Sequence, residues 1–422
     1  MTKRRYGTTE IKHVDWARVA EQVVGCAVVV AVDVAKDDFV AAVMVCEEAA
    51  VVLIKWRHPE QTALLLRGLE QLRAQCELAV AMEPSGTYGD ALRWQLTARG
   101  IDVYRASPKR VHDAAEVFDG VASLHDAKAA LLIGRFHLQG CTQLWLEPDA
   151  ERRELLAHLR LLEIHKALYR AHLNRLEAQL SRHWPEALRI LGLGSVSLAV
   201  LVRTYGSPAE VDAHAAHARA LLRSTVRGGA TSERIERLLD SAAATLGAPC
   251  VAAERQLLST LAAEVLRARD AQHGVEQALK ALVQAHESMR RMASVVGEIA
   301  SATLYANHGD VRGYPQIRAY LKVIGLNLKE RSSGKQHGPL RLSKRGAPSS
   351  RHSLYYAALG YLRRDEHVRR WYQAKLQRPG AVRTKLIVAL MRRLAKALWH
   401  VARGARFDSA RLFAPPAAAS RS

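Results

Sequence analysis

In the first third of the chain, short apolar runs alternate with polar turns. Its longer segments carry leucines at a spacing that would place them on one face of a helix. The β-branched run 28–34, the polar turn 35–38 and the run 39–45 predict a hairpin of two strands. Leucines within 59–75 fall at the spacing of an amphipathic helix, and the fully apolar run 78–82 is typical of a buried strand. Further strands are expected at 51–56 and 101–106, and further helices at about 89–97, 109–117 and 124–138.

This order of strands and helices is that of a ribonuclease H-like α/β domain. From Glu151 onward the composition shifts to helix formers, and apolar residues recur at three- and four-residue steps between 159 and 180, which predicts a coiled coil. We therefore expect an α/β plus all-α protein. Its expected parts are a basic arm (1–20), the ribonuclease H-like domain (21–148), the coiled coil (149–185), a helical insertion with a second long helix (186–290), a C-terminal helical domain that carries a serine-rich loop (291–410) and a disordered tail (411–422).

The charge of the chain points to a polyanionic partner. Among 422 residues, 62 Lys and Arg outnumber 41 Asp and Glu, which gives a net charge of +21. A surplus this large favours DNA or RNA as the partner. The five cysteines are scattered without metal-ligand spacing, and the longest apolar run, 23–32, is too short to span a bilayer. We therefore expect a cytoplasmic protein without membrane contact.

Three acidic residues of the first domain are candidates for a metal site. Asp33 lies within a run of valines on the expected first strand, where a lone buried carboxylate is costly unless it is paired or binds metal. Glu83 follows the fourth strand, which neighbours the first in the ribonuclease H-like order. Asp126 opens a helix. Alone, Asp126 is more simply a helix N-cap and Glu83 a turn residue; together the three favour a Mg²⁺ or Mn²⁺ site.

A second candidate region lies near the C-terminus. Residues 326–338 and 341–346 form a Gly- and Ser-rich loop that is crowded with basic side chains. Such groups around a hydroxyl suit attack on a phosphodiester, because they hold the phosphate and stabilise its developing charge. A flexible loop that contacts phosphate without chemistry explains the same composition. The candidate nucleic-acid contacts are Arg331, Lys335, Arg341, Lys344, Arg345 and Arg351.

Several of these segments, taken in order, resemble a known family. The segments Val32-Asp33-Val34-Ala35-Lys36-Asp37 and Glu83-Pro84-Ser85-Gly86-Thr87-Tyr88 are similar to two motifs of the DEDD-type insertion-sequence transposases of the "one-ten" family, relatives of the Piv invertase and of bridge-RNA-guided recombinases. The segment 106–111 matches a third motif, with serine in place of asparagine. The C-terminal block, which includes Ser333-Gly334, Ser343-Lys344-Arg345-Gly346 and His352-Ser353-Leu354-Tyr355, follows in the family's order.

The resemblance implies a RuvC-like first domain that binds Mg²⁺ and a serine recombinase chemistry in which Ser333 joins DNA through a phosphoserine. Ser332 is the second choice for the nucleophile. The resemblance also implies a homodimer or homotetramer, in which the carboxylates of one subunit approach the serine of another. It further implies a structured, element-encoded guide RNA that pairs with both DNA partners.

One departure from the family pattern concerns the fourth acid. The ungapped match makes Asp126 the third acid and places Ala129 where the fourth should be. A shift by three residues makes Asp126 the fourth acid and leaves Ser123 at the third position. His125 or Asp119 are the candidates to compensate.

Three functions remain in view. The leading hypothesis is an RNA-guided DNA transposase with a serine nucleophile. The first alternative is a metal-dependent nuclease or junction resolvase without covalent serine chemistry, and the second is a nucleic-acid-binding protein that has lost catalysis.

Overall fold

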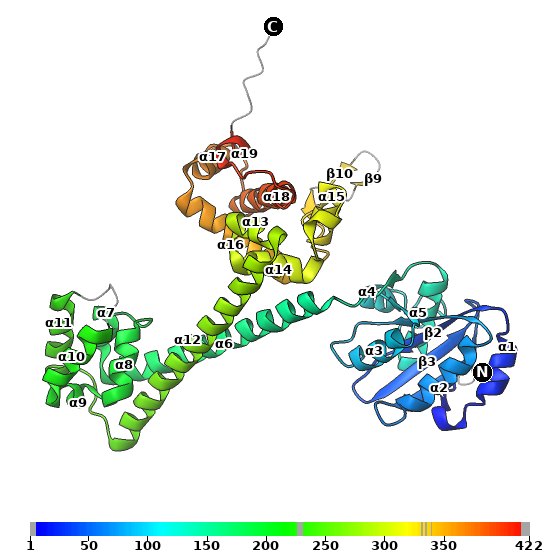
Figure 1. The fold of residues 1–422 in the computed structure, drawn as a ribbon, viewed down its shortest axis with the longest axis horizontal. Helices are drawn as coiled ribbons and strands as arrows, with labels where there is room; N and C mark the ends of the chain where they lie inside the picture. The colour runs from blue at the N-terminus through cyan, green and yellow to red at the C-terminus, as the bar shows by residue number, and fades with distance from the viewer. Residues whose placement is uncertain (1–5, 226–230, 331, 334–335, 339, 415–422) are drawn as a thin grey trace, which may run out of the picture. The chain divides into compact units, whose positions relative to one another are not determined.

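The computed structural model describes residues 6–225, 231–330, 332–333, 336–338 and 340–414, and of residues 332, 333, 336 and 337 it describes the backbone alone. Two compact units make up the chain, residues 1–147 and residues 148–422. The first unit is built on a mixed β-sheet, and the second consists almost entirely of helices (Figure 1). Each unit buries its own apolar clusters, so each has the core that an independent fold requires.

A seven-stranded mixed sheet forms the centre of the first unit. Its strands are β1 (Thr9–Glu10), β2 (Ala27–Asp33), β3 (Asp38–Met44), β4 (Ala50–Arg57), β5 (Glu77–Met82), β6 (Asp102–Arg105) and β7 (Gln143–Leu144). Their order across the sheet is β1-β4-β3-β2-β5-β6-β7. The strands β2, β3 and β4 form an antiparallel meander, and β5 and β6 continue from β2 in parallel. The predicted adjacency of the first and fourth apolar strands is confirmed in β2 and β5.

Alternation along β2 sends its side chains to two different layers. Val28, Val30 and Val32 pack with one set of helices, whereas Val29 and Ala31 pack with another. Because both faces are covered, the strand is apolar at nearly every position. The first layer contains α1 (Trp16–Gln22), α2 (Thr62–Arg73) and α3 (Asp90–Ala98), and the second contains α4 (Pro108–Asp113) and α5 (Asp126–Leu138).

The predicted loose arm over residues 1–20 is wrong for the part that the structure describes. Strand β1 pairs in parallel with β4, and a short 3₁₀ helix (Ile11–His13) leads into α1. Ile11 and Val19 are buried in the first layer. A few apolar residues are enough to cover the sheet there, although the segment is polar and basic on average.

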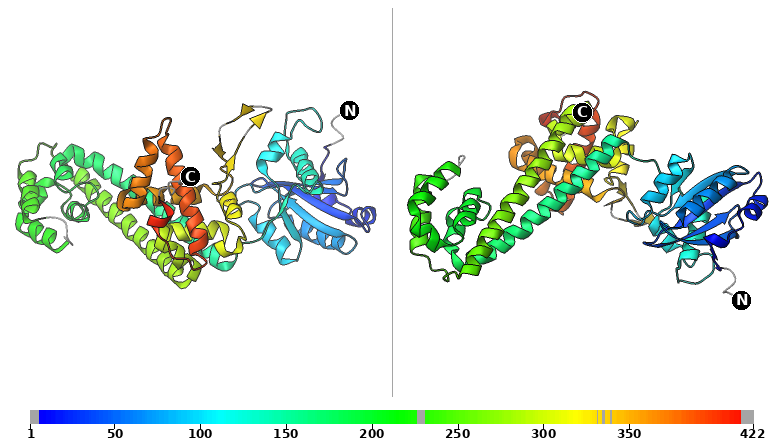
Figure 2. Two further views of the ribbon diagram at one scale, coloured as in Figure 1. Left: turned by 90° about the horizontal axis from the view of Figure 1, so that it is seen from above. Right: turned by 60° about the horizontal axis from the view of Figure 1, so that its bottom comes forward.

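Two long helices organise the second unit. The helices α6 (Ala150–His183) and α12 (Ala252–Ala285) pack side by side (Figure 2). Leu155 near the start of α6 shares a core with Leu279 near the end of α12, while Leu180 shares another core with Leu258. The helices are therefore antiparallel, and the predicted apolar seam of α6 is buried against a helix of the same chain. That this pair supercoils as a coiled coil stays a prediction.

A group of short helices surrounds each end of this pair (Figure 1). The first group contains α7 (Pro185–Ile190), α8 (Val196–Tyr205), α9 (Pro208–Ala213), α10 (Ala215–Thr225) and α11 (Ser232–Ala243). The second contains α13 (Glu287–Val296), α14 (Glu298–His308), a 3₁₀ helix (Val311–Gly313), α15 (Ile317–Val323), α16 (Pro348–Arg364), α17 (Glu366–Leu376), α18 (Arg383–Val401) and α19 (Ser409–Leu412). The second group also holds four short strands, β8 (Leu328–Lys329), β9 (Ser332–Ser333), β10 (Gln336–His337) and β11 (Arg341–Leu342).

The predicted disordered tail over 411–422 is wrong at its beginning. Helix α19 continues to Leu412, and Phe413 is only 3% exposed because its ring packs edge-on against Trp371. Residues 415–422 lie outside the described residues. Within the described part of the chain, no helix combines the length and the apolar character needed to cross a membrane.

Candidate active site

Asp33 and Glu83 lie at the carboxyl ends of two neighbouring parallel strands. Strand β2 ends at Asp33, β5 ends one residue before Glu83, and Val32 pairs with Met82 across the ladder. The two acids are therefore the next pair in register. Since side chains alternate along a strand, both belong to the face that α5 covers. The structure thus brings the two predicted carboxylates to the same edge and the same face of the sheet.

Asp126 is the first residue of α5 and lies one position after the N-cap. His125 is the N-cap, and its Nδ1 accepts a hydrogen bond of 3.3 Å from the backbone N–H of Lys128. The helix lies close to the sheet because Gly134 has no side chain: a Cβ there would lie 2.4 Å from Sδ of Met44. Helix α5 packs on β2 and β3, and the negative charge of Asp126 acts on Asp33.

The electrostatics of Asp33 show that the other two acids act on it. The pKa of its carboxyl is raised from 3.8 to about 7. Burial is the largest cause, followed by the charges of Asp126 and of Glu83, while a hydrogen bond from the backbone of Val34 opposes the rise. Burial also raises the pKa of Glu83. Mutually repelling, partly buried carboxylates of this kind gain from a nearby cation.

The donor set fits a divalent cation in its chemistry. Carboxylate oxygens are the ligands that Mg²⁺ and Mn²⁺ prefer. In spacing, however, the set is wider than a ligand shell, because among the described residues no three His, Cys, Asp or Glu side chains converge closely enough to hold an ion. Asp126 is exposed, so its side chain has room to turn toward the other two.

The two positions proposed for a missing fourth acid differ in their surroundings. Ala129 is 5% exposed and packs in the cluster between α5 and the sheet. It lies three residues after Asp126, so the two share one face of the helix. Ser123 lies in the exposed loop before α5. A carboxylate at 129 would therefore stand under the helix against the sheet, whereas one at 123 would stand in solvent.

The two residues expected to compensate for this acid are already engaged. Asp119 accepts hydrogen bonds from Lys128 Nζ at 2.8 Å and from the hydroxyl of Tyr6 at 2.6 Å, and these bonds hold its pKa well below the usual range. The His125 ring caps α5 and meets Tyr6 edge-on. Both side chains therefore contact Tyr6 and stabilise the segment before α5.

Lys128 is a residue that the sequence analysis missed. It is 3% exposed, and besides Asp119 its Nζ donates to the carbonyl oxygens of Val121 at 2.7 Å and Ser123 at 3.1 Å. These bonds tie the loop that precedes Asp126 to α5. The available signal was a single lysine inside the apolar run 127–133.

The described strands of the predicted serine region form two antiparallel pairs, and β8, β9, β10 and β11 are together called the serine hairpin below. Strand β8 pairs with β11, and β9 pairs with β10, both in antiparallel fashion. Ser332 and Ser333 form β9, and only their backbone is described. The predicted phosphate contacts Arg331 and Lys335 lie outside the described residues.

Two glycines clamp the base of the serine hairpin. Gly325 and Gly346 have φ values of 72° and 106°, which disfavour other residues. A Cβ on Gly325 would lie 2.2 Å from the carbonyl oxygen of Arg345, and one on Gly346 would lie 2.0 Å from that of Val323. The segments before and after the hairpin therefore cross at a distance that only glycine permits.

The remaining predicted phosphate contacts lie at or beside this base. Arg341 belongs to β11, and Lys344 and Arg345 follow it with exposed side chains. Lys344 has a φ of 54°, which is uncommon for a residue with a side chain. Arg351 in α16 donates to the carbonyl oxygen of Gly346 at 3.0 Å, so it supports the clamp as well.

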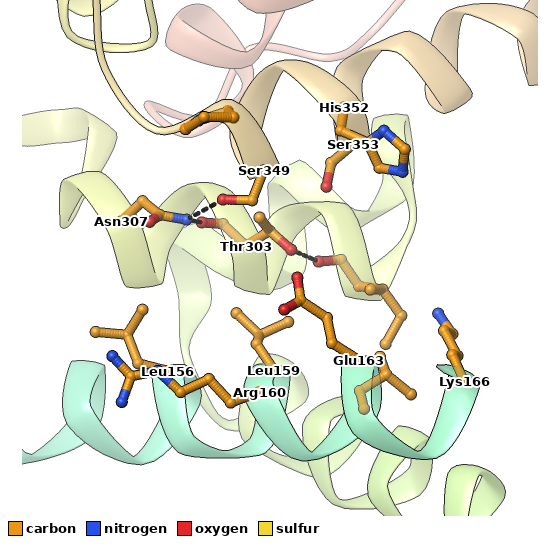
Figure 3. A pocket seen from close by; sticks show the side chains of 13 residues that line it. Leu156, Leu159, Arg160, Glu163, Lys166, Thr303, Asn307, Ser349, His352 and Ser353 are labelled. Carbon is orange, nitrogen blue, oxygen red and sulfur yellow. Dashed lines mark hydrogen bonds between the residues drawn. The ribbon is translucent and has the colours of Figure 1, made fainter. Parts of the chain in front are cut away.

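A cavity of about 620 Å³ lies between α6, α14 and α16 (Figure 3). Figure 3 shows Glu163 and Lys166 on α6 opposite Asn307, Ser349 and His352. Asn307 already donates to the hydroxyl of Ser349 at 3.2 Å, so part of this polar lining is occupied in holding α14 against α16.

A buried serine–histidine pair next to this cavity is structural. The ring of His308 and the hydroxyl of Ser350 are 2.8 Å apart. Burial, aided by the positive charges of Arg152 and Arg351, lowers the pKa of His308 to about 4, so the ring stays neutral. Ser350 has no exposed surface and cannot reach a substrate.

The sheet order, with acids at the ends of β2 and β5 and on α5, is consistent with a ribonuclease H-like domain, and the second unit is helical. Comparison with known proteins matches both units to transposases. A transposase family model of the DEDD type matches residues 30–185, and the model described as "Transposase IS116/IS110/IS902 family" matches residues 287–373. The chain belongs to this family of transposases.

Two curated relatives support the assignment. The transposase for insertion sequence element IS1111A from Coxiella burnetii is 31% identical over 154 residues, which cover 34% of this chain and 41% of that protein. A probable family 20 transposase from Pseudomonas aeruginosa is 31% identical over 170 residues, which cover 38% of this chain and 49% of that protein. The aligned part therefore spans less than half of either relative.

Proposed function

We propose that this protein is a transposase that cuts and rejoins the DNA of an insertion sequence. The observation that carries the proposal is the position of Asp33 and Glu83, which lie in register at the ends of β2 and β5, where burial and the charges of Asp126 and Glu83 raise the pKa of Asp33 to about 7. Acids in that arrangement serve phosphodiester chemistry when they hold a divalent cation. Membership of a transposase family makes DNA the substrate that fits.

The second unit supplies the nucleophile in this proposal. The Oγ atom of Ser333 attacks a phosphorus atom of the DNA backbone, a P–O bond to the serine forms, and the bond to a deoxyribose oxygen breaks. The departing oxygen takes up a proton. A free hydroxyl of the incoming strand then attacks the phosphoserine, which forms the new DNA junction and releases the serine. Arg341, Lys344 and Arg345 neutralise the phosphate during both steps.

The first unit acts on the same DNA through its acids. Asp33, Glu83 and Asp126 would hold Mg²⁺ or Mn²⁺, which supplies charge to stabilise the developing negative oxygen. Lys128 positions Asp126 through the loop that it anchors. The net charge of +21 favours binding to DNA, to a structured guide RNA encoded by the element, or to both. Assembly as a homodimer or homotetramer would let the acids of one subunit serve the serine of another.

Covalent trapping tests this function. The protein is mixed with labelled element-end DNA, target DNA, Mg²⁺ and RNA transcribed from the flanks of the element, and a denaturing gel is run. We expect a protein–DNA adduct that disappears in Ser333→Ala while DNA binding persists. Ser332→Ala is the matched control, since it removes the neighbouring hydroxyl, and it should retain the adduct.

The other outcomes separate the alternatives. DNA that is cut without an adduct, in a reaction that Asp33→Asn abolishes, would identify a metal-dependent nuclease or junction resolvase. Binding without cleavage or adduct would identify a nucleic-acid-binding protein that has lost its chemistry. If adduct formation instead requires Ser332, then Ser332 is the nucleophile and the rest of the mechanism is unchanged.

A further inference from the structure

An open groove of about 810 Å³ lies between the base of the serine hairpin and helix α18. Leu328 and Leu340 from the hairpin and Val388 from α18 contribute apolar side chains to it. Leu328 in β8 is 42% exposed, and Leu340, which directly precedes β11, is 59% exposed. The groove therefore presents apolar surface to whatever enters it.

Positive charge surrounds this apolar surface. Lys329, Arg341 and Lys344 line the groove from the hairpin side, and Lys385 and Lys396 line it from α18. None of the described residues that line the groove is acidic. Cations on both sides of the groove favour the binding of a polyanion between them.

Two arginines hold the wall of the groove in place. Arg392 donates to the carbonyl oxygen of Leu326 at 2.8 Å, and burial lowers its pKa. The guanidinium of Arg393 lies 5.0 Å from the centre of the Trp371 ring. Arg392 thus fixes α18 against the segment that leads into the hairpin, and Arg393 holds α18 against α17, so the α18 wall of the groove is preformed.

The apolar floor distinguishes an unpaired strand from a duplex. A duplex presents phosphates and sugars on its outer surface, so it would set charged oxygens against the exposed leucines. An unpaired strand turns the faces of its bases outward, and these pack on apolar side chains while the phosphates reach basic residues. The apolar and basic lining of the groove therefore fits an unpaired strand.

We propose that this groove binds an unpaired strand of nucleic acid, with bases on Leu328 and Leu340 and phosphates at the surrounding lysines and arginines. The proposal rests on the proposed function, because DNA exchange opens duplexes and exposes such strands. Lys329 lies four residues before Ser333, a span of at most about 14 Å in extended chain. A strand bound in the groove would therefore lie close to Ser333.

Fluorescence anisotropy on the full-length protein tests the proposal. The probe is a short labelled oligonucleotide of mixed sequence, single-stranded or annealed to its complement. Leu340→Ser should weaken single-strand binding by roughly fivefold at every salt concentration and leave duplex binding unchanged. Lys385→Glu should also weaken it and reduce the slope of log affinity against log salt by about 0.7 for each lost phosphate contact.

Lys280→Glu on α12 is the matched charge control, because Lys280 is exposed and lies outside the groove. It should leave single-strand binding unchanged. The proposal is overturned if Leu340→Ser has no effect, or if Lys280→Glu weakens binding as much as Lys385→Glu. It is equally overturned if polyglutamate displaces the probe as well as unlabelled single strand does, which would identify an acidic peptide as the occupant.

These results are separable from the test of the proposed function. If the groove variants bind single strands normally while the adduct at Ser333 still forms, the groove proposal fails and the transposase function stands. If the wild-type protein binds no nucleic acid in either form, both proposals fail together.

Discussion

At the scale of single residues, the charge state of Asp33 depends strongly on its surroundings. Its pKa in the folded protein, about 7, lies above the ordinary value of 3.8. Between these values the folded protein keeps a proton that the unfolded chain has lost. The contribution of Asp33 to stability is therefore complete below pH 3.8, falls as the pH rises, and is fully lost above pH 7.

The first prediction follows for Asp33→Asn. In EDTA at pH 8, we expect this variant to be more stable than the wild type by roughly 1–3 kcal/mol, because a partly buried charge is removed. At pH 3.5 the difference should vanish. Urea unfolding at both pH values measures it. Mg²⁺ should then stabilise the wild type and leave the variant unchanged. If the free energy of unfolding changed with pH in the same way for both proteins, the raised pKa of Asp33 would be contradicted.

The second prediction decides which acid of the family pattern is missing. Ala129→Asp places a carboxylate on the same helix face as Asp126, against the sheet. We expect it to destabilise the metal-free protein by about 2 kcal/mol, since a carboxylate is buried, and to tighten Mn²⁺ binding. Isothermal titration with Mn²⁺ measures the affinity. Ser123→Asp is the matched comparison: tighter binding in this variant instead would make Asp126 the fourth acid.

At the scale of elements, alternation and helical spacing were sufficient to predict the five central strands of the sheet, but not β1 and β7. The run 28–34 became β2, the run 78–82 became β5, and their adjacency brought Asp33 beside Glu83. These features depend on local periodicity, which a sequence displays directly. The ribonuclease H-like order was predictable for the same reason.

Contacts between distant residues were not predictable in this way. Asp119 looked available as a metal ligand, but Tyr6 and Lys128 bind it, and neither partner is visible from local pattern. The polar segment that contains Ile11 was predicted to be an arm. Its place in the fold depends on the pairing of β1 with β4, which local sequence does not reveal. In both cases the outcome is set by tertiary packing.

The third prediction concerns the clamp at the base of the serine hairpin. Gly346→Ala should destabilise the second unit by about 1–3 kcal/mol, because φ is 106° and the new Cβ would meet the carbonyl oxygen of Val323. We also expect adduct formation at Ser333 to fall, since the hairpin loses its fixed base. Thermal unfolding and the trapping gel measure the two effects.

Gly313→Ala is the control for this prediction. A Cβ on Gly313 would have nothing within 4 Å, and its φ is not positive, so alanine there should change neither stability nor adduct yield. If both glycine variants behave alike, the clamp does not control the hairpin.

At the scale of the whole molecule, the two units divide the proposed chemistry between them. The acids belong to residues 1–147, whereas the serine hairpin and its basic groove belong to residues 148–422. Each unit has separate apolar clusters: the first is stabilised by packing on both faces of a sheet, and the second by packing along α6 and α12. A ligand of one unit should therefore stabilise that unit alone.

The last prediction tests this division by differential scanning calorimetry of the full-length protein. Multi-domain chains commonly unfold in more than one transition, and a ligand raises the midpoint only of the part that binds it. We expect Mg²⁺ to raise one transition and a short single-stranded oligonucleotide to raise the other. Asp33→Asn should abolish the first shift and keep the second, while Leu340→Ser should diminish the second and keep the first. A single transition that both ligands raise together would mean that acids and groove belong to one cooperative unit, and the separate cores would then not account for the stability of the chain.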